Sequence, residues 1–258
     1  MLSDKDIDSM KTLYFPFDLP VPYFFEENKF IEIFPISMKD SLMFLSCKEI
    51  LTIDKNSSTD VEIIQMPYLD YIVKILFKED ELNSYRLRFL LENCLHIKLP
   101  QFGFNEKGHA FLYDEERDLI ITHKQFDDIK KIILYQNIID YDDTYINPEL
   151  KESIEESKKL KSSNIEVPNI ERKMAIITAH CGISKQEQME MTYRTHEMLF
   201  NEVSEEVDFY TTRNAVLITG SSKDFDHWIY KKKKKWLDGY TSSVGSVAKS
   251  AGIQNVNM

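Results

Sequence analysis

The feature that most limits the fold is a change of hydrophobic period between residues 93 and 122. Beginning at Cys94 the chain reads CLHIKLPQFGFNEKGHAFLYDEERDLIITHK, and alternating apolar residues flank two polar segments, NEKG and DEERD. This alternation predicts strands, and the polar segments predict turns. Before and after this segment, the apolar residues follow helical spacing. The sequence therefore predicts an α+β, mostly α fold: a small antiparallel β meander with helices in the first part, and an all-helical second part.

Other elements of the first part follow from proline content and capping signals. Residues 12–36 hold four of the eight prolines among aromatic residues, which predicts an extended arm and then a strand over 29–36 with Phe30, Glu32 and Phe34 in alternation. Ser37 with Asp40, and Thr122 with Gln125, are candidate capping boxes. We predict helices over 38–50, over about 59–78, over 81–92, and from Thr122 to about Asn137.

Helical patterns fill the second part. Asn147-Pro148 predicts a helix start, because asparagine can accept from first-turn amides while proline gives up an amide that is unpaired anyway. We predict a solvated helix over 148–161, a linker over 162–169, a helix over 170–181 closed by Gly182, a capping box from Ser184 to Glu187, and a long helix from Thr192 to about 218. The predicted domains are 1–140 (α+β), 147–238 (helical) and 239–258 (a flexible, glycine-rich tail).

Composition narrows the class of protein. The net charge of −11 and the pI near 5.1 argue against general duplex binding, whose affinity comes from lysine and arginine. Three widely spaced cysteines, Cys47, Cys94 and Cys181, predict reduced thiols and no disulfide framework. The N-terminus lacks the order of a signal peptide, and no apolar run approaches the roughly 18 residues of a membrane span. We expect a cytoplasmic protein without membrane insertion.

The chain offers little support for catalysis. Only seven glycines occur, and neither a dinucleotide fingerprint nor a P-loop is present. The soft metal ligands are His180-Cys181 and the trio Cys94, His96 and His109, and neither group supplies a complete zinc site by itself. No GxSxG locates a nucleophile, so a triad among six scattered histidines is permitted but not indicated. We predict no enzyme activity, no metal and no cofactor.

A lysine run near the end stands out in this acidic chain. Residues 228–240 read WIYKKKKKWLDGY. The lysines can bind nucleic acid or another anionic partner, with Trp228, Tyr230 and Trp236 stacking on bases. They can also complement the dipole at a helix C-terminus and stay in water, which protein physics favours. Both interpretations remain open at this point, although nucleic acid is disfavoured by the overall charge.

The order of the segments resembles a known family. The segments are FIEIFPISMKDSLMFLSCKEILTI, THKQFDDIKKIILYQNIIDYDDTYINPELKESIEE, IERKMAIITAHCGISKQEQMEMTYRTHEMLFNEV and DHW, within about residues 28–230. Together they resemble the tail assembly chaperones of long-tailed bacteriophages that infect low-GC Gram-positive hosts. The resemblance implies a non-enzymatic protein in the cytoplasm of the infected bacterial host, which coats the tape measure protein and helps recruit tail tube subunits.

In many such families a longer product arises by ribosomal frameshifting near the end of the shorter one. The resemblance therefore adds a third interpretation of the lysine run: five lysines can be encoded by a run of adenines on which ribosomes slip.

A partner that keeps a long helical chain soluble needs apolar or methionine-rich grooves on a charged body. Residues 174–198 supply four methionines within 25 residues of helical pattern, and two tryptophans flank the lysine run. The predicted partner-binding residues are Met174, Met189, Met191, Met198, Trp228 and Trp236. Methionines on helices also fill cores, so packing is the alternative. A structural baseplate or tail-completion protein, and a host-directed phage protein such as a defence inhibitor, are the alternative functions.

Overall fold

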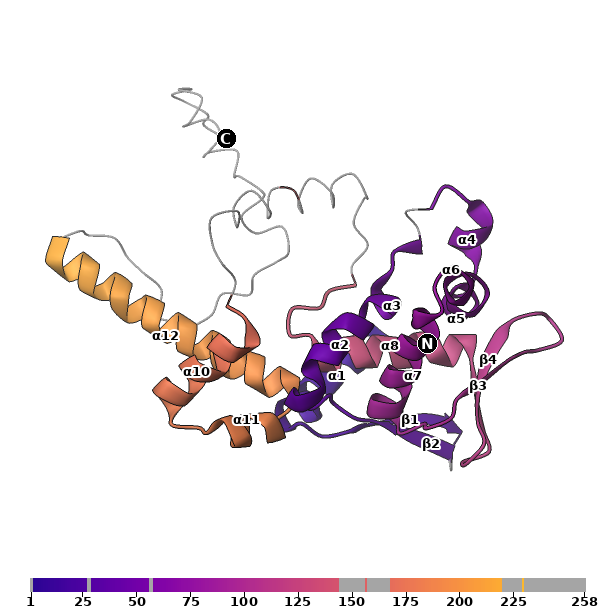
Figure 1. Ribbon diagram of the computed structural model, residues 1–258, viewed down its shortest axis with the longest axis horizontal. Helices are drawn as coiled ribbons and strands as arrows, with labels where there is room; N and C mark the ends of the chain where they lie inside the picture. The colour runs from indigo at the N-terminus through magenta and orange to yellow at the C-terminus, as the bar shows by residue number, and fades with distance from the viewer. Residues whose placement is uncertain are drawn as a thin grey trace, which may run out of the picture. The chain divides into compact units, whose positions relative to one another are not determined.

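The computed structural model describes residues 2–26, 29–55, 58–143, 156, 168–219 and 229. The fold is α+β and mostly α, as predicted, with a two-stranded and a three-stranded antiparallel sheet (Figure 1). The chain divides into two compact units: Met1–Thr144 with Pro168–Val203, and Tyr145–Val167 with Ser204–Met258. The predicted boundaries at 140 and 147 stay a prediction.

The predicted meander is confirmed. Strands β3 (Gln101–Phe104), β4 (Ala110–Asp114) and β5 (Leu119–Thr122) pair in that order. The turn at NEKG contains Gly108 at φ 77°, and the turn after β4 contains Asp118 at φ 47°. Both turns use left-handed backbone, which glycine and aspartate adopt more readily than other residues.

The predicted arm is wrong over residues 21–26, which form a strand. Strand β1 (Val21–Glu26) pairs with β2 (Lys29–Ile33), and Pro22 stands opposite Glu32. Proline is tolerated there because alternate pairs in an antiparallel ladder exchange no hydrogen bond. The buried face of β2 belongs to Ile31 and Ile33, while Phe30 and Glu32 are exposed.

Two predicted helices are interrupted. The helix over 38–50 begins as a 3₁₀ turn and breaks at Lys48, and the helix over 59–78 breaks at Met66-Pro67, since a residue before proline is pushed to extended backbone. The elements are η2 (Met38–Asp40), α2 (Ser41–Cys47), α3 (Glu49–Thr52), α4 (Val61–Gln65), α5 (Tyr68–Tyr71), the π-helical η4 (Ile72–Leu76) and α6 (Phe77–Glu79). Before β1 lie α1 (Asp4–Leu13) and η1 (Phe15–Phe17).

Helices α7 (Leu82–Leu95) and α8 (His123–Asn137) supply much of the core. The predicted capping box of Thr122 and Gln125 opens α8. At its other end, the buried Asn137 side chain accepts a hydrogen bond from the Ile36 amide at 2.7 Å. Helix α8 therefore anchors the segment that follows β2.

The predicted helices after residue 168 are also confirmed. Helix α10 (Ile170–Cys181) ends at Gly182 with φ 73°, α11 (Lys185–Glu190) begins with the capping box of Ser184 and Glu187, and α12 (Tyr193–Thr219) is the long helix (Figure 1). The Met38 amide donates to the Met191 carbonyl and the Tyr193 amide donates to the Ile36 carbonyl, both at 2.8 Å. These bonds attach the start of α12 to the segment after β2.

No helix of the described ranges is long and apolar enough to cross a membrane. Apart from Glu156 and Ile229, the predicted helix over 148–161, most of the linker, the lysine run and the tail lie outside the described residues.

Candidate partner-binding surfaces

Helix α12 carries one apolar stripe along its length. His196, Phe200 and Val203 follow one another at spacings of four and three residues, and Val207, Tyr210 and Leu217 continue the same side. His196 and Val203 are buried, at 0% and 5% exposure, whereas Val207, Tyr210 and Leu217 are 50%, 43% and 69% exposed. We call the last three residues the distal stripe. The distal stripe continues the side of α12 that is packed in its first half.

The four predicted methionines lie in different environments. Met174 is 8% exposed on α10, so its side chain belongs to the interior. Met191 is half-buried at the end of α11, and its carbonyl accepts a hydrogen bond from the Met38 amide. Met189 and Met198 are 37% and 40% exposed. Trp228 and Trp236 lie outside the described residues, and the partner-binding role of the set stays a prediction.

A buried polar network holds α10, α11 and the first half of α12 together. Gln188 donates through Nε2 to the Met174 carbonyl at 3.1 Å and to the Ile183 carbonyl at 3.0 Å. Its Oε1 lies 3.2 Å from His196 Nε2. Because the amide nitrogen of Gln188 already donates to carbonyls, its oxygen is the natural acceptor for an N–H of His196.

An ion pair adds to this network. Lys173 Nζ lies 2.7 Å from Glu197 Oε2 and 5.1 Å from the centre of the Phe200 ring. Burial alone would raise the pKa of Glu197, but contacts with His196 and Lys173 outweigh burial and hold that pKa below its usual value. The first half of α12 is thus fixed by both apolar and polar contacts.

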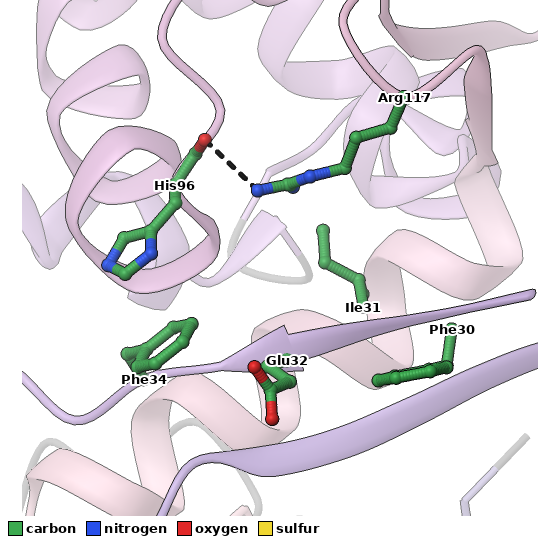
Figure 2. Close-up of a pocket in the computed structure, with 6 residues that line it drawn as sticks. All are labelled: Phe30, Ile31, Glu32, Phe34, His96 and Arg117. Atoms are coloured by element: carbon green, nitrogen blue, oxygen red, sulfur yellow. Dashed lines mark hydrogen bonds between the residues drawn. The ribbon is translucent and has the colours of Figure 1, made fainter.

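A hollow of ≈ 240 Å³ opens beside β2 (Figure 2). It is lined by Phe30, Ile31, Glu32, Phe34, His96 and Arg117. His96 ends α7 in the left-handed conformation and stacks on Phe34, with ring centres 4.0 Å apart. A second hollow of ≈ 250 Å³ shares Phe34 and His96 and includes Ser37, Lys39, Asp40 and Asn93. We call the two together the edge groove.

Arg117 forms one wall of the edge groove. Its guanidinium donates to the carbonyls of Leu95 at 2.9 Å and His96 at 3.3 Å, and Figure 2 shows the second of these bonds. It also lies 3.4 Å from the Asp114 carboxylate. Arg117 thereby donates hydrogen bonds to carbonyls at the end of α7, which have no partner inside the helix and would otherwise bond to water.

The residues considered for metal or nucleophilic chemistry are dispersed. Cys94 is fully buried, and burial raises the pKa of its thiol, so it is a poor thiolate. His96 stacks on Phe34, while His109 contacts Asp70 at 3.0 Å. In the part of the chain that the structure describes, no group of three His, Cys, Asp or Glu side chains is placed to hold a metal ion.

Asp70 is a buried carboxylate with three polar partners. It accepts from the Ala110 amide at 2.6 Å and from Lys74 Nζ at 3.1 Å, besides contacting His109. Lys74 also donates to the Gly108 carbonyl at 2.7 Å. This network ties the β3–β4 turn to α5 and η4, which is a structural role.

Comparison of the chain with protein-family models, with curated proteins and with solved structures gave no match. We therefore infer function from the residues themselves and from the resemblance in segment order.

Sequence reasoning missed Arg117 and Phe34 as parts of one surface. Arg117 appeared only inside the polar DEERD turn, and its partners Leu95 and His96 lie 22 and 21 residues away. The remaining signal was weak: Phe34 is one of the alternating aromatic residues of the predicted strand over 29–36, which alone does not indicate a groove.

Proposed function

We propose that this protein is a non-enzymatic tail assembly chaperone of a long-tailed bacteriophage, and that it binds a helical segment of the tape measure protein through the distal stripe of α12. The resemblance of the segment order supports the family. The continuation of the α12 stripe from buried to exposed residues is the observation that supports this mode of binding.

The chemistry of the distal stripe favours an amphipathic helix as partner. Val207, Tyr210 and Leu217 recur at spacings of three and seven residues, which places them on one side of a helix. The first half of α12 is already joined to α11 by the contact of Gln188 with His196, and to α10 by the ion pair of Lys173 with Glu197. A partner helix with its own apolar side can extend this packing, as in helix-in-groove recognition.

Recruitment of tail tube subunits and action in the cytoplasm of the infected host belong to the same proposal. Both follow from the resemblance. A tape measure protein is long and helical, so apolar stripes must be covered until the tube assembles around it.

Co-expression tests the proposal directly. The full chain, tagged, is co-expressed with the tape measure protein of the same phage, and the recovered tape measure protein is quantified. Val207→Glu with Leu217→Glu places two charges in the distal stripe, and we expect recovery to fall at least ten-fold because each buried charge is costly. The matched control is Thr212→Glu, since Thr212 lies on the opposite side of α12.

The control should recover as much tape measure protein as the wild type. Equal recovery with the double variant, at equal soluble expression, would exclude the distal stripe as the binding surface.

A further inference from the structure

Two histidine side chains are in contact where β4 begins and β5 ends. His109 directly precedes β4, and His123 is the first residue of α8, directly after β5. Phe111 pairs with Thr122 at this end of the sheet, so both histidines lie just beyond the last pair of the ladder. The centres of the two imidazole rings are 4.6 Å apart, and the rings are inclined at 41°. The sheet therefore brings together two imidazoles that are separated in the sequence by the whole of β4 and β5.

Hydrogen bonds fix the backbone on both sides of His109. The His109 amide donates to Asn105 Oδ1 at 2.9 Å, and the next amide, of Ala110, donates to Asp70 Oδ1 at 2.6 Å. Gly108, directly before His109, makes the turn in left-handed backbone. The His109 side chain is thus held at a defined position, which is what a ligand of a metal or small molecule requires.

The Asp70 carboxylate determines which ring nitrogen of His109 is available. His109 Nδ1 lies 3.0 Å from Asp70 Oδ2. Because an ionised carboxylate only accepts hydrogen bonds, Nδ1 carries the hydrogen and Nε2 keeps its lone pair. Burial alone would raise the pKa of Asp70, but hydrogen bonds from Ala110, His109 and Lys74 outweigh burial and hold that pKa below its usual value. A carboxylate behind the far ring nitrogen is the arrangement that orients histidine ligands of zinc.

His123 supplies the second imidazole. The capping box of Thr122 and Gln125 fixes the start of α8, and with it the backbone of His123. The His123 ring is half-buried, and among the described residues no hydrogen bond engages its nitrogens. The His109 side chain is 37% exposed. Both rings are therefore within reach of water and dissolved ions.

The spacing of the two rings fits two ligands of one metal ion. Zinc–nitrogen bonds of about 2.0 Å and a near-tetrahedral angle place the centres of two imidazole ligands roughly 5 Å apart. The observed separation of 4.6 Å is close to this value. In the part of the chain that the structure describes, no third His, Cys, Asp or Glu completes the group, so water would supply the remaining ligands.

The charges around the pair are mixed. Lys74 Nζ lies 3.1 Å from Asp70 Oδ2 and 2.7 Å from the Gly108 carbonyl, and these acceptors hold it on the Nδ1 side of His109. A metal ion would bind at Nε2, on the opposite side of the ring. Asp127, one turn later on α8, interacts electrostatically with His123. A divalent cation at Nε2 would therefore not be opposed by a cluster of positive charge.

We infer that His109 and His123 bind a zinc ion, with Asp70 as the positioning residue for His109 and water in the remaining coordination positions. The sequence groups His109 with Cys94 and His96 and predicts no metal, whereas the structure places His109 next to His123. Bound zinc would connect the start of β4 to the start of α8. This site goes beyond the proposed contact of α12 with a helix and uses none of the residues of that contact.

Isothermal titration calorimetry of the untagged full chain with Zn²⁺ tests the inference, at about pH 7.5 because metal ligands must be deprotonated. Every protein carries Cys181→Ser, which removes an exposed thiol as a competing ligand. We expect a saturable site of micromolar affinity in this parent, and at least ten-fold weaker binding in His109→Gln and in His123→Gln. His180→Gln is the matched control, because it removes a histidine of α10 and should leave the affinity unchanged.

Thermal unfolding provides a second measurement. Zinc that binds the folded protein at a hundred-fold excess over Kd should raise Tm of the parent by roughly 5 °C, and neither His109→Gln nor His123→Gln should show this shift. Unfolding without zinc checks that both variants fold, and if one does not, the other decides.

Three results would overturn the inference. They are unchanged zinc affinity in a folded His109→Gln or His123→Gln variant, an equal loss of affinity in His180→Gln, and binding only in the millimolar range, which would indicate an adventitious ion only. The co-expression result for α12 is independent of these outcomes, so failure of one proposal is distinguishable from failure of the other.

Discussion

At the scale of single residues, buried polar groups determine which helices pack together. Gln188 and His196 are both fully buried and contact each other, and the neighbouring Lys173–Glu197 ion pair is mostly buried. A buried ion pair is costly to break on one side, because the remaining charge stays in the interior. These four residues thus specify the packing of α10, α11 and the first half of α12.

Glu197 gives this packing a dependence on pH. Its pKa is below the usual value in the folded protein, so the unfolded chain binds a proton more readily. The stability that Glu197 contributes is present above the unfolded pKa and is lost as the pH falls through the folded pKa. We expect the wild type to exceed Glu197→Gln in free energy of unfolding at pH 6, and the difference to shrink toward pH 3. Urea titrations of both proteins measure this, and a constant difference would contradict it.

Residue-scale contacts were the least predictable feature. The Ile36 amide donates to the side chain of Asn137, which is 101 residues away in the sequence. The Thr192 hydroxyl donates to the carboxylate of Asp18, which is 174 residues away, and both bonds are 2.7 Å long. No local pattern encodes such partners. The edge groove depends on contacts of this kind, so its residues could not be grouped from the sequence.

At the scale of elements, local capping predicts where helices begin. The reciprocal bonds of Thr122 with Gln125 and of Ser184 with Glu187 occur as the sequence indicates. Both involve residues three positions apart, so their geometry does not depend on the rest of the fold. Strand β1 was missed for the opposite reason: Pro22 disfavours a strand locally, and only its place opposite Glu32 makes it acceptable.

The capping box of α11 is testable by substitution. Ser184 Oγ accepts from the Glu187 amide at 3.2 Å, and the Glu187 carboxylate accepts from the Ser184 amide at 2.8 Å. We expect Ser184→Ala to lower the free energy of unfolding by about 1 kcal/mol, since an amide loses its partner. Ser9→Ala is the control: the Ser9 hydroxyl donates to the Lys5 carbonyl inside α1, and its loss should have little effect. Equal losses in the two variants in urea titrations would contradict a capping role.

At the scale of the whole molecule, the predicted class of fold holds while the predicted division of the chain stays open. Residues 168–203, predicted as part of a separate helical domain, belong to the same compact unit as the first 144 residues. Hydrophobic period identifies helices and strands, but it does not indicate which of them share a core. The proposed function assigns partner binding to α12 of this fold. It also determines whether the protein is expected in finished phage particles.

An assembly chaperone must be abundant during tail formation and missing from the finished particle. The most direct measurement is quantitative mass spectrometry of peptides from residues 1–230 in infected-cell lysate and in purified particles. For an assembly chaperone, we expect abundant peptides in the lysate and none at stoichiometric level in the particles. Stoichiometric presence in the particles would contradict the chaperone function and identify a structural tail protein.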